Sequence, residues 1–406
     1  MKTSNGPLAG LRVLEITQIM SGPTCGLLLA DMGADVIKIE KIPGGDDARG
    51  YRDPQVGGVS APFMMMNRNK RGLALDLKSP KGRALLLKMV KSADVLVENF
   101  RGGTMDKLGL GYEALKAGNP GLIYCAITGY GRTGPYADKG GFDLIAQGFA
   151  GLMSITGEAG RPPAKSGSAV SDMNAGILGA LGILAAYIHK LKTGVGQVVD
   201  TSLSDAALQQ TYWHAAVWFA TRRSPEPTGS AHILTAPYQA FEASDGWINI
   251  GGANQTNWER ICDVLEHPQW RDDPRFATNS DRMANLGALV DLMNAVLRTG
   301  TRARWQAAFD AAGVPAGPVH TIGEALSHPQ TLARGMVVDI EHPQAGRTQA
   351  VGCPIHFSAT ADRSSTPAPL LGQHTREVLR EFDLAEAEID ALLAEGVVSE
   401  PLPRTG

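Results

Sequence analysis

The 406-residue sequence contains little cysteine and no excess of charge of either sign. Its four cysteines, Cys25, Cys125, Cys262 and Cys353, lack CxxC spacing, which argues against a zinc site or a disulfide framework. The net charge of −3 gives no reason to expect nucleic acid or an anionic membrane as a partner. We therefore expect a globular protein of the reducing cytoplasm.

Several recognisable sequence signals are also missing. The N-terminal residues MKTSNGPLAG hold no apolar core of a secretory signal, and the longest apolar run, near residues 177–188, is too short to span a bilayer. The nine histidines show no HxxxH or HExxH spacing, so we expect no metal site. Neither a GxSxG elbow nor a Walker loop is present, which leaves serine-hydrolase and NTPase functions without support.

The chain is too long for one ordinary core, and its length predicts two or three domains. A run rich in proline and glycine between residues 225 and 230 places a domain boundary near residues 220–230. The expected parts are residues 1–220, which begin a large domain, residues 221–330, which form a smaller α+β domain with its linkers, and residues 331–406.

Residues 11–40 read as strand, helix and strand. The strings LRVLEITQ and ADVIKIE are rich in valine, isoleucine and leucine, and the gap between them fits a short crossover helix. The same order follows in a strand at residues 73–77, a helix opened by Pro80 and the strand ADVLVENF, after which LIYCAIT adds another strand. The sequence therefore predicts an α/β protein whose large domain is Rossmann-like with a parallel sheet.

The glycine-rich segments do not indicate a dinucleotide site. The turn after the first strand lacks the GxGxxG fingerprint. Gly129, Gly131 and Gly134 match that spacing, but Pro135 and a glycine-rich stretch follow where the motif needs a helix. We expect a flexible active-site loop there instead.

Residues 166–193 combine one acidic residue with a long apolar run. Asp172 lies in the predicted first turn of a helix that is apolar on nearly every side, so we expect this helix to be buried and to cross the core. Asp172 has two interpretations: a helix cap, or an anion favoured by the helix dipole with room for a substrate above it. Small residues that would let another backbone approach the helix form a stripe of Ala175, Gly179, Gly182 and Ala186.

Basic residues gather near the predicted strand ends. They are either solvated surface charges or the anchor of a phosphate-bearing ligand. The set consists of Lys38, Lys41, Arg68, Lys70, Arg71, Arg101 and Lys107.

Several strings together resemble the class III coenzyme A transferases, the formyl-CoA and carnitine CoA-transferase family. They are VLEITQIMSGPTCGLLLADMGADVIKIEK, NKRGLALDLKSPKG, DVLVENFRGG, GYGRTGPYADKGGFDLIAQGFAG, SDMNAGILGALGILAAYIHKLKTGVGQVVD and TAPYQAF. The resemblance follows the family's order over nearly the whole chain. It implies that residues 331–406 return to the large domain, and that each chain forms an open ring interlocked with a second chain in a homodimer.

The resemblance also implies an acyl-CoA:carboxylate CoA-transferase. Asp172 would attack the donor thioester to give an anhydride and then an aspartyl-CoA thioester. The substrates would be an acyl-CoA and a small carboxylic acid, with no permanently bound cofactor. The implied coenzyme A site consists of Ile19, Lys41, Leu75, Asn99, Phe100 and Lys107. The implied substrate pocket consists of Met20, Phe142, Gly229, Ser230, His232 and Tyr238.

Two features bear on which acid is used. Met20 stands where the formyl-CoA relative has a glutamine near the thioester, so formate or oxalate specificity does not follow from the resemblance. A dicarboxylic acid such as succinate would suit a cation near the site, unless the available cations are solvated loop charges. The candidates are Arg161, Lys165, Arg222 and Arg223.

Two other functions stay open. An α-methylacyl-CoA racemase shares the fold and uses the histidine of a GHD string, whereas this chain has Phe142 at that place, and phenylalanine cannot transfer a proton. The other alternative is a coenzyme A-binding protein without catalysis, which an intact Asp172 disfavours.

Overall fold

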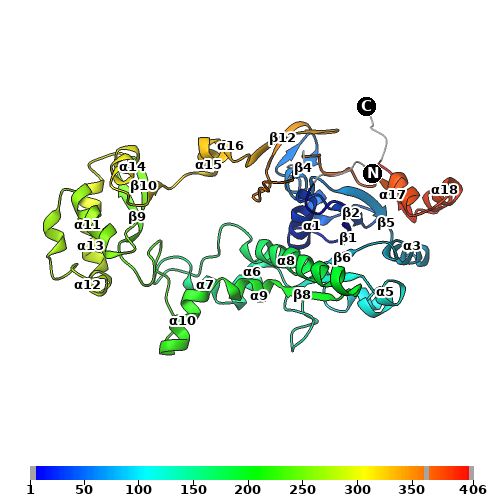
Figure 1. Cartoon of the computed structure of the whole chain (residues 1–406), viewed down its shortest axis with the longest axis horizontal. Coiled ribbons are helices and arrows are strands. Elements are labelled where there is room, and N and C mark those ends of the chain that lie inside the picture. The colour runs from blue at the N-terminus through cyan, green and yellow to red at the C-terminus, as the bar shows by residue number, and fades with distance from the viewer. Residues whose placement is uncertain (1–5, 361–364, 402–406) are drawn as a thin grey trace. The chain divides into compact units, whose positions relative to one another are not determined.

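The computed structural model describes residues 6–360 and 365–401 and divides into two compact units (Figure 1). The large unit consists of Met1–Leu152, Ser166–Thr211 and Gln330–Gly406. The small unit consists of Met153–Lys165 and Tyr212–Pro329. The expected division at residue 220 assigned Met153–Lys165 to the large domain, because no change of composition marks this segment.

A seven-stranded sheet forms the centre of the large unit, in the order β14-β5-β2-β1-β6-β7-β8. All neighbouring strands are parallel except β14 and β5, which are antiparallel. The predicted α/β class and parallel sheet are thus confirmed. The strands are β1 (Arg12–Ile16), β2 (Asp35–Glu40), β5 (Arg71–Leu75), β6 (Val95–Glu98), β7 (Ile123–Thr128), β8 (Val198–Ser202) and β14 (Val398–Ser399).

Helices cover both faces of this sheet (Figure 1). Alternate residues of a strand point to opposite faces, so Val13 and Val95 lie in one core while Leu14 and Leu96 lie in the other. The first face carries α1 (Ser21–Asp31), α6 (Asp143–Phe149), α8 (Val170–Thr193) and α9 (Leu203–Gln209). The second carries α3 (Pro80–Val90), α4 (Thr104–Lys107), α5 (Tyr112–Gly118), α17 (Thr375–Glu381) and α18 (Glu386–Ala394).

The small-residue stripe of α8 packs on the sheet. A Cβ added at Gly179 would lie 2.9 Å from the side chain of Ile127 on β7. Another helix does approach α8 closely, but at a glycine outside the predicted stripe: a Cβ added at Gly176 would lie 2.5 Å from the carbonyl oxygen of Ser21 on α1. The two glycines of the stripe, Gly179 and Gly182, therefore meet side chains of strands β7 and β8 rather than a second helix backbone.

The opposite face of α8 is exposed, which corrects the prediction of a helix buried on all sides. Its apolar residues recur at helical spacing and include Met173, Ile177, Leu181, Ile188 and Leu191. With 24 residues, α8 is also long and apolar enough to cross a bilayer by length and composition, contrary to the expectation from its shorter apolar run. A core helix passes the same test, and α8 packs on the sheet and on α1, so this property is weak support for a membrane span.

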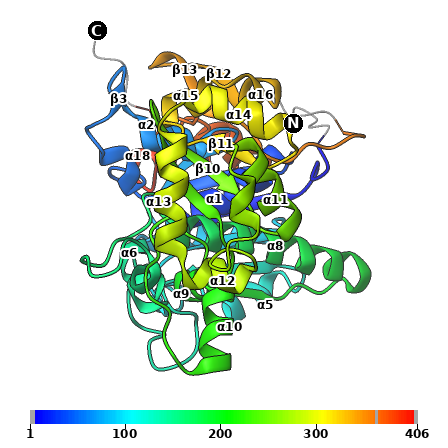
Figure 2. The ribbon, with the colours of Figure 1, turned by 90° about the vertical axis from the view of Figure 1, so that its left-hand side faces the viewer.

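The small unit contains a three-stranded antiparallel sheet in the order β11-β10-β9, with helices around it (Figure 2). Its core includes the fully buried side chains of Trp258, Phe276 and Phe309. The strands are β9 (Tyr238–Ala243), β10 (Gly246–Gly251) and β11 (Ala316–Pro318). The helices around this core are α11 (Gln255–Val264), η2 (Pro268–Arg271), α12 (Asn279–Ala284), α13 (Leu286–Leu297) and α14 (Arg302–Ala311).

The remaining elements are shorter. Residues 129–142 form a loop between β7 and α6, so no helix begins at Gly134, as expected. Two hairpins are formed by β3 (Gln55–Val56) with β4 (Val59–Ser60) and by β12 (Val337–His342) with β13 (Gly346–Val351). The remaining helices are η1 (Asp47–Gly50), α2 (Ala61–Asn67), α7 (Leu152–Ile155), α10 (Tyr212–Thr221), α15 (Ile322–Ser327) and α16 (Pro329–Ala333).

Candidate active site

A cavity of about 570 Å³ opens at the carboxyl ends of four strands of the large unit, β1, β2, β5 and β6. Open α/β sheets bind their ligands at this edge. Four residues of the predicted coenzyme A site line this cavity together, and they are Lys41, Leu75, Phe100 and Lys107.

The cavity lining combines apolar surface with three lysines. Lys41 and Lys107 are expected from the sequence, whereas Lys78 is not, although it follows β5 at the same edge of the sheet. Lys41 also forms an ion pair with Asp47 at the rim. Apolar walls with a few cations suit a ligand that carries both a flat apolar group and phosphates.

The other two residues of the predicted coenzyme A site are Ile19, which lies in the loop between β1 and α1, and Asn99, which binds this loop. Asn99 accepts a hydrogen bond from the Gln18 N–H at 2.9 Å through Oδ1, and its Nδ2 donates to the Gln18 carbonyl at 2.8 Å. Ile19 adopts a left-handed conformation with φ of 66°, which is unusual for a β-branched residue. Asn99 and Ile19 thus determine where the loop runs, and its residues Thr17 and Gln18 line the cavity.

Four charged side chains are buried beneath this loop. Lys38 Nζ lies 3.2 Å from Glu15 and 2.8 Å from Asp46, and Lys70 Nζ lies 2.8 Å from Glu15. Lys38 also donates to the Thr17 carbonyl in this loop, and Lys70 donates to the Pro23 carbonyl in the first turn of α1. Burial lowers the pKa of Lys70 to about 8, against the raising effect of Glu15. Members of the predicted basic set that are held in ion pairs with acidic side chains are Lys38, Lys41, Arg68, Lys70 and Arg71.

Asp172 occupies the first turn of α8, but its side chain does not cap the helix. The N-cap residue is Ala169, which provides no side-chain cap. The Ser171 N–H donates instead to Oδ1 of Asp143 on α6, at 2.9 Å. Among the hydrogen bonds of the described residues, none involves the Asp172 carboxylate. The structure therefore gives no support to the cap interpretation.

The Asp172 carboxylate is partly buried. Burial and, second, the negative charge of Asp143 raise its pKa to about 6. The helix dipole alone predicts a shift in the other direction, so burial outweighs it here. A carboxylate with such a pKa is ionised at pH 7 and is a stronger base than an ordinary aspartate.

The predicted substrate-pocket residues fall in both units. In the large unit, Met20 is the N-cap residue of α1, and Phe142 is the N-cap residue of α6 with 71% of its surface exposed. In the small unit, the ring of His232 lies 5.4 Å from that of Tyr238 and 6.3 Å from that of Trp213. Trp213 was not predicted, because nothing in the sequence relates it to a loop about twenty residues later.

The turn before His232 is built from the other two predicted residues. Gly229 has φ of 63°, a conformation that favours glycine, and its N–H donates to the Gly157 carbonyl. The Ser230 hydroxyl accepts a hydrogen bond from the Ala240 N–H at 3.1 Å. Gly229, Ser230, His232 and Tyr238 therefore lie close together within the small unit.

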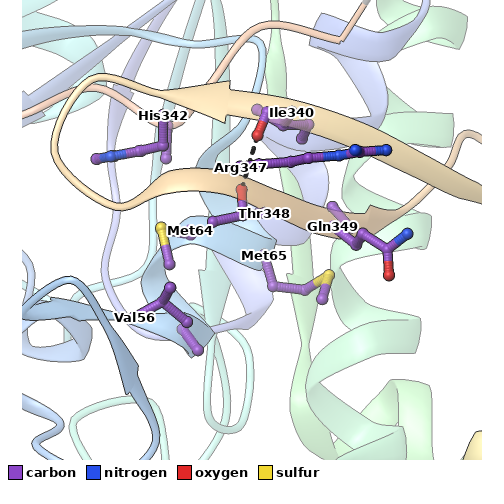
Figure 3. A pocket seen from close by; sticks show the side chains of 11 residues that line it. Val56, Met64, Met65, Ile340, His342, Arg347, Thr348 and Gln349 are labelled. Atoms are coloured by element: carbon purple, nitrogen blue, oxygen red, sulfur yellow. Dashed lines mark hydrogen bonds between the residues drawn. The ribbon is translucent and has the colours of Figure 1, made fainter.

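A second cavity, of about 150 Å³, lies between α2 and the β12–β13 hairpin (Figure 3). Its lining includes Met64 and Met65, and the Thr348 hydroxyl donates to the Ile340 carbonyl at 3.1 Å. His342 accepts hydrogen bonds from two N–H groups of the hairpin turn through Nδ1, so this nitrogen already has a structural role. None of the predicted site residues lines this cavity.

A family model described as CoA-transferase family III matches residues 8–375. The chain belongs to this family. The transferase is 39% identical over 392 residues to the succinate–glutarate CoA-transferase of Agrobacterium fabrum, a match that covers 95% of this chain and 98% of that protein. It is 35% identical over 395 residues to the succinyl-CoA:glutarate CoA-transferase of Mus musculus, covering 97% of this chain and 91% of that protein.

Two further comparisons agree with this membership. The acetyl-CoA:oxalate CoA-transferase of Acetobacter aceti is 38% identical over 385 residues, covering 94% of this chain and 97% of that protein. The crystal structure of a CAIB/BAIF family protein from Brucella suis has a TM-score of 0.84 at 39% identity and covers 94% of this chain and 100% of that one. The predicted activity, transfer of coenzyme A from an acyl-CoA thioester to a carboxylic acid, is thus confirmed at the level of the family.

Proposed function

We propose that Asp172 is the nucleophile of this CoA-transferase. The observation that carries the proposal is its placement in the first turn of α8 as a partly buried carboxylate with no capping role. Its pKa of about 6 leaves it ionised at neutral pH and still basic enough to attack a thioester.

The proposed reaction balances without a metal or a redox group. A carboxylate oxygen of Asp172 attacks the thioester carbonyl of the donor, the C–S bond breaks, and coenzyme A leaves as a thiolate with the electron pair of that bond. The thiolate attacks the aspartyl carbonyl of the mixed anhydride, which releases the donor acid as a carboxylate and leaves an aspartyl-CoA thioester. The acceptor carboxylate then attacks this thioester, and the same steps run in reverse.

The proposal places the nucleotide part of coenzyme A in the 570 Å³ cavity. The support is the combination of Leu75 and Phe100 with the lysines Lys41, Lys78 and Lys107 at the carboxyl ends of the strands. The loop that contains Ile19 and is held by Asn99 would shape the wall of this site. Coenzyme A would be a substrate here rather than a permanently bound cofactor.

We further propose that the acids exchanged are dicarboxylic. Relatives of this chain are named for succinate, glutarate, oxalate and D-citramalate. A second carboxylate needs a cation or strong donors. The exposed cations named as candidates are Arg161, Lys165, Arg222 and Arg223, all in the small unit.

The proposed oligomer is a homodimer of open rings that interlock. Its support is the exposed apolar face of α8, where Leu181 is 61% exposed, since a stripe of this kind on a soluble enzyme usually marks an interface. Helix α10 also supports an interface. None of its residues is buried within the chain, although it carries Trp213, Trp218 and Phe219. Sedimentation of wild type and of Leu181→Arg tests the proposal, which predicts that the substitution weakens the dimer.

Asp172→Ala tests the nucleophile. We expect turnover to fall below detection while coenzyme A binding, measured by calorimetry, is retained. Incubation of wild type with succinyl-CoA and hydroxylamine should convert residue 172 to a hydroxamate that mass spectrometry locates. Asp291→Ala, an exposed position on α13, is the matched control and should leave both readouts unchanged. Ordinary turnover in Asp172→Ala would overturn the assignment.

A panel of donors and acceptors tests the acid class separately. Succinyl-CoA, acetyl-CoA, butyryl-CoA and an aromatic acyl-CoA are assayed against mono- and dicarboxylic acids of matched length. We expect higher kcat/KM for dicarboxylates on both sides of the reaction. A uniform preference for monocarboxylates would remove the dicarboxylate proposal and leave the transferase activity untouched.

A further inference from the structure

Helix α8 begins without a capping side chain of its own. In many helices the side chain of a serine, threonine, aspartate or asparagine at the N-cap accepts a hydrogen bond from the first N–H groups. The N-cap residue here is Ala169, which cannot do so. The acceptor for Ser171 comes from a different helix, because Asp143 stands in the first turn of α6 and reaches it with Oδ1 at 2.9 Å. The helix that carries the nucleophile is therefore fixed at its start by a residue 28 positions before Ser171.

A glutamine extends this contact into a chain of directed hydrogen bonds. Gln147 lies one turn after Asp143 on α6 and is almost completely buried. Its Nε2 donates to Oδ2 of Asp143 at 2.7 Å, and its Oε1 accepts from the Ser166 N–H at 2.9 Å. Asp143 and Gln147 thus hold the two ends of the segment 166–171, which leads directly into Asp172.

The directions of these bonds are fixed by chemistry. Both carboxylate oxygens of Asp143 accept, one from Ser171 and one from Gln147, so a neutral amide at position 143 could serve only one of them. Gln147 in turn must present its oxygen to Ser166 and its nitrogen to Asp143. Neither residue has a rotated form that satisfies all three bonds.

Asp143 also brings a negative charge to the nucleophile. It is the charged group whose field acts on Asp172. Other acids on the elements packed against α8 have partners of their own: Asp31 of α1 pairs with Arg68, Asp200 of β8 accepts from the Arg132 N–H, and Asp205 of α9 accepts from Ser202. A neighbouring anion makes a carboxylate more basic.

We propose that Asp143 and Gln147 are positioning residues for transfer: their hydrogen-bond chain sets the orientation of the Asp172 carboxylate, and the charge of Asp143 keeps that carboxylate nucleophilic. This inference rests on the proposed role of Asp172. Misplacement of a reacting group by about 1 Å costs roughly 100-fold in rate, so the hydrogen-bond chain has a measurable kinetic consequence.

Single substitutions at Asp143 and Gln147 break the hydrogen-bond chain in opposite ways. Asp143→Asn sets an amide against the Gln147 amide, donor facing donor, and Gln147→Glu sets two carboxylates against each other. We expect each to lower kcat by about 10- to 100-fold, with KM for the acyl-CoA changed less than threefold, because the nucleotide is held elsewhere.

The double variant Asp143→Asn/Gln147→Glu restores every bond. The new amide accepts from Ser171 and donates to the new carboxylate, which also accepts from Ser166, and the net charge is unchanged. We expect kcat to recover to within about fivefold of wild type. The negative charge has moved away from Asp172, so the acidic limb of the pH–rate profile should shift to lower pH even in this rescued enzyme. A merely structural role would not move that limb.

The outcomes are distinguishable. Turnover that is unchanged in the single variants overturns the inference, as does a double variant that shows no recovery over the singles or does not fold. Thermal unfolding and coenzyme A binding of all three variants separate lost positioning from lost structure. Hydroxylamine labelling of wild type is the check on the underlying role: if residue 172 is not labelled, the nucleophile proposal fails first, whereas labelling with unaffected single variants removes only Asp143 and Gln147.

Discussion

The Ile19 N–H donates a hydrogen bond to Oδ1 of Asp46 over 2.9 Å, across a separation of 27 residues. The same oxygen accepts from the Ala48 N–H, and the other oxygen faces Lys38. A buried carboxylate therefore stabilises a backbone conformation that isoleucine adopts at a cost of about 1–3 kcal/mol. The loop beside the cavity depends on a charge from the loop that follows β2.

Asp46→Asn should loosen this loop. The amide can still accept from Ile19, but its nitrogen then faces the Lys38 ammonium, which leaves a buried charge poorly paired. We expect the unfolding free energy to fall by about 3 kcal/mol and coenzyme A to bind more weakly. Urea denaturation and calorimetry measure both. Asp291→Asn, exposed on α13, is the control, and an Asp46→Asn protein with wild-type affinity would show that the loop does not depend on the carboxylate.

Asp172→Asn should stabilise the protein at pH 7. In the folded state the pKa of this carboxyl group is about 6, raised by burial and by Asp143, whereas in the unfolded chain it is that of an ordinary aspartate. At pH 7 the ionised carboxylate therefore destabilises the folded state. After allowance for partial exposure, we expect a gain of about 1–2 kcal/mol. The gain is full above pH 6 and disappears towards pH 4, because the wild-type carboxyl is then protonated in the folded state. Thermal unfolding across this pH range checks the sign, and a gain that persists at pH 4 would contradict it.

Gly176→Ala and Gly287→Ala form a matched pair. An added methyl at position 176 would lie 2.5 Å from a backbone oxygen of α1, which cannot move without shifting the helix, so we expect a loss of about 1–3 kcal/mol. An added methyl at position 287 on α13 meets open space and should stabilise slightly through helix propensity. Equal melting temperatures for the two variants would argue against the close packing of α1 on α8.

Lys107→Ala should weaken coenzyme A binding about three- to tenfold, since the lysine lines the cavity and offers a cation to a phosphate. The difference from wild type should shrink as salt concentration rises. Lys81→Ala, on the exposed surface of α3, removes the same charge away from the cavity and should leave affinity unchanged. Equal effects of the two substitutions would point to net charge rather than a specific contact.

Deuterium from solvent should not enter the α-carbon of a 2-methylacyl-CoA at a catalytic rate. The racemase reaction needs two proton-transferring groups, and Phe142 stands where the racemases have their histidine. Proton NMR of the substrate in deuterated buffer measures the exchange. Rapid exchange would restore the racemase alternative.

Much of the large unit can be predicted from local pattern. Strands β1 and β2 are short runs of valine, isoleucine and leucine on either side of a helix, and that order alone predicts parallel pairing. Placement of Asp172 in a first helical turn follows from the apolar run behind it. These features depend on residues that are neighbours in the sequence, so the local sequence pattern can predict them.

The contacts around the candidate site could not be predicted in the same way. The partners of Lys38 are Glu15, on another strand, and Asp46, in a loop beyond β2, so its sequence neighbours give it the appearance of a surface charge. The contact of Asp143 with the start of α8 joins two helices separated in sequence by α7 and a loop, and no spacing rule covers that distance. Likewise, Gly176 is the close-approach position because α1 happens to cross there.

The last described strand, β14, pairs with β5 at the edge of the sheet, Val398 opposite Leu75. A chain made from its N-terminus therefore exposes the unpaired hydrogen-bonding edge of β5 until almost everything else has been synthesised, including the entire small unit. An open parallel sheet with a free apolar edge strand is a template for pairing with the wrong chain. Nascent protein should consequently need protection, by slow translation or by a chaperone, until residues 397–399 arrive to cover that strand.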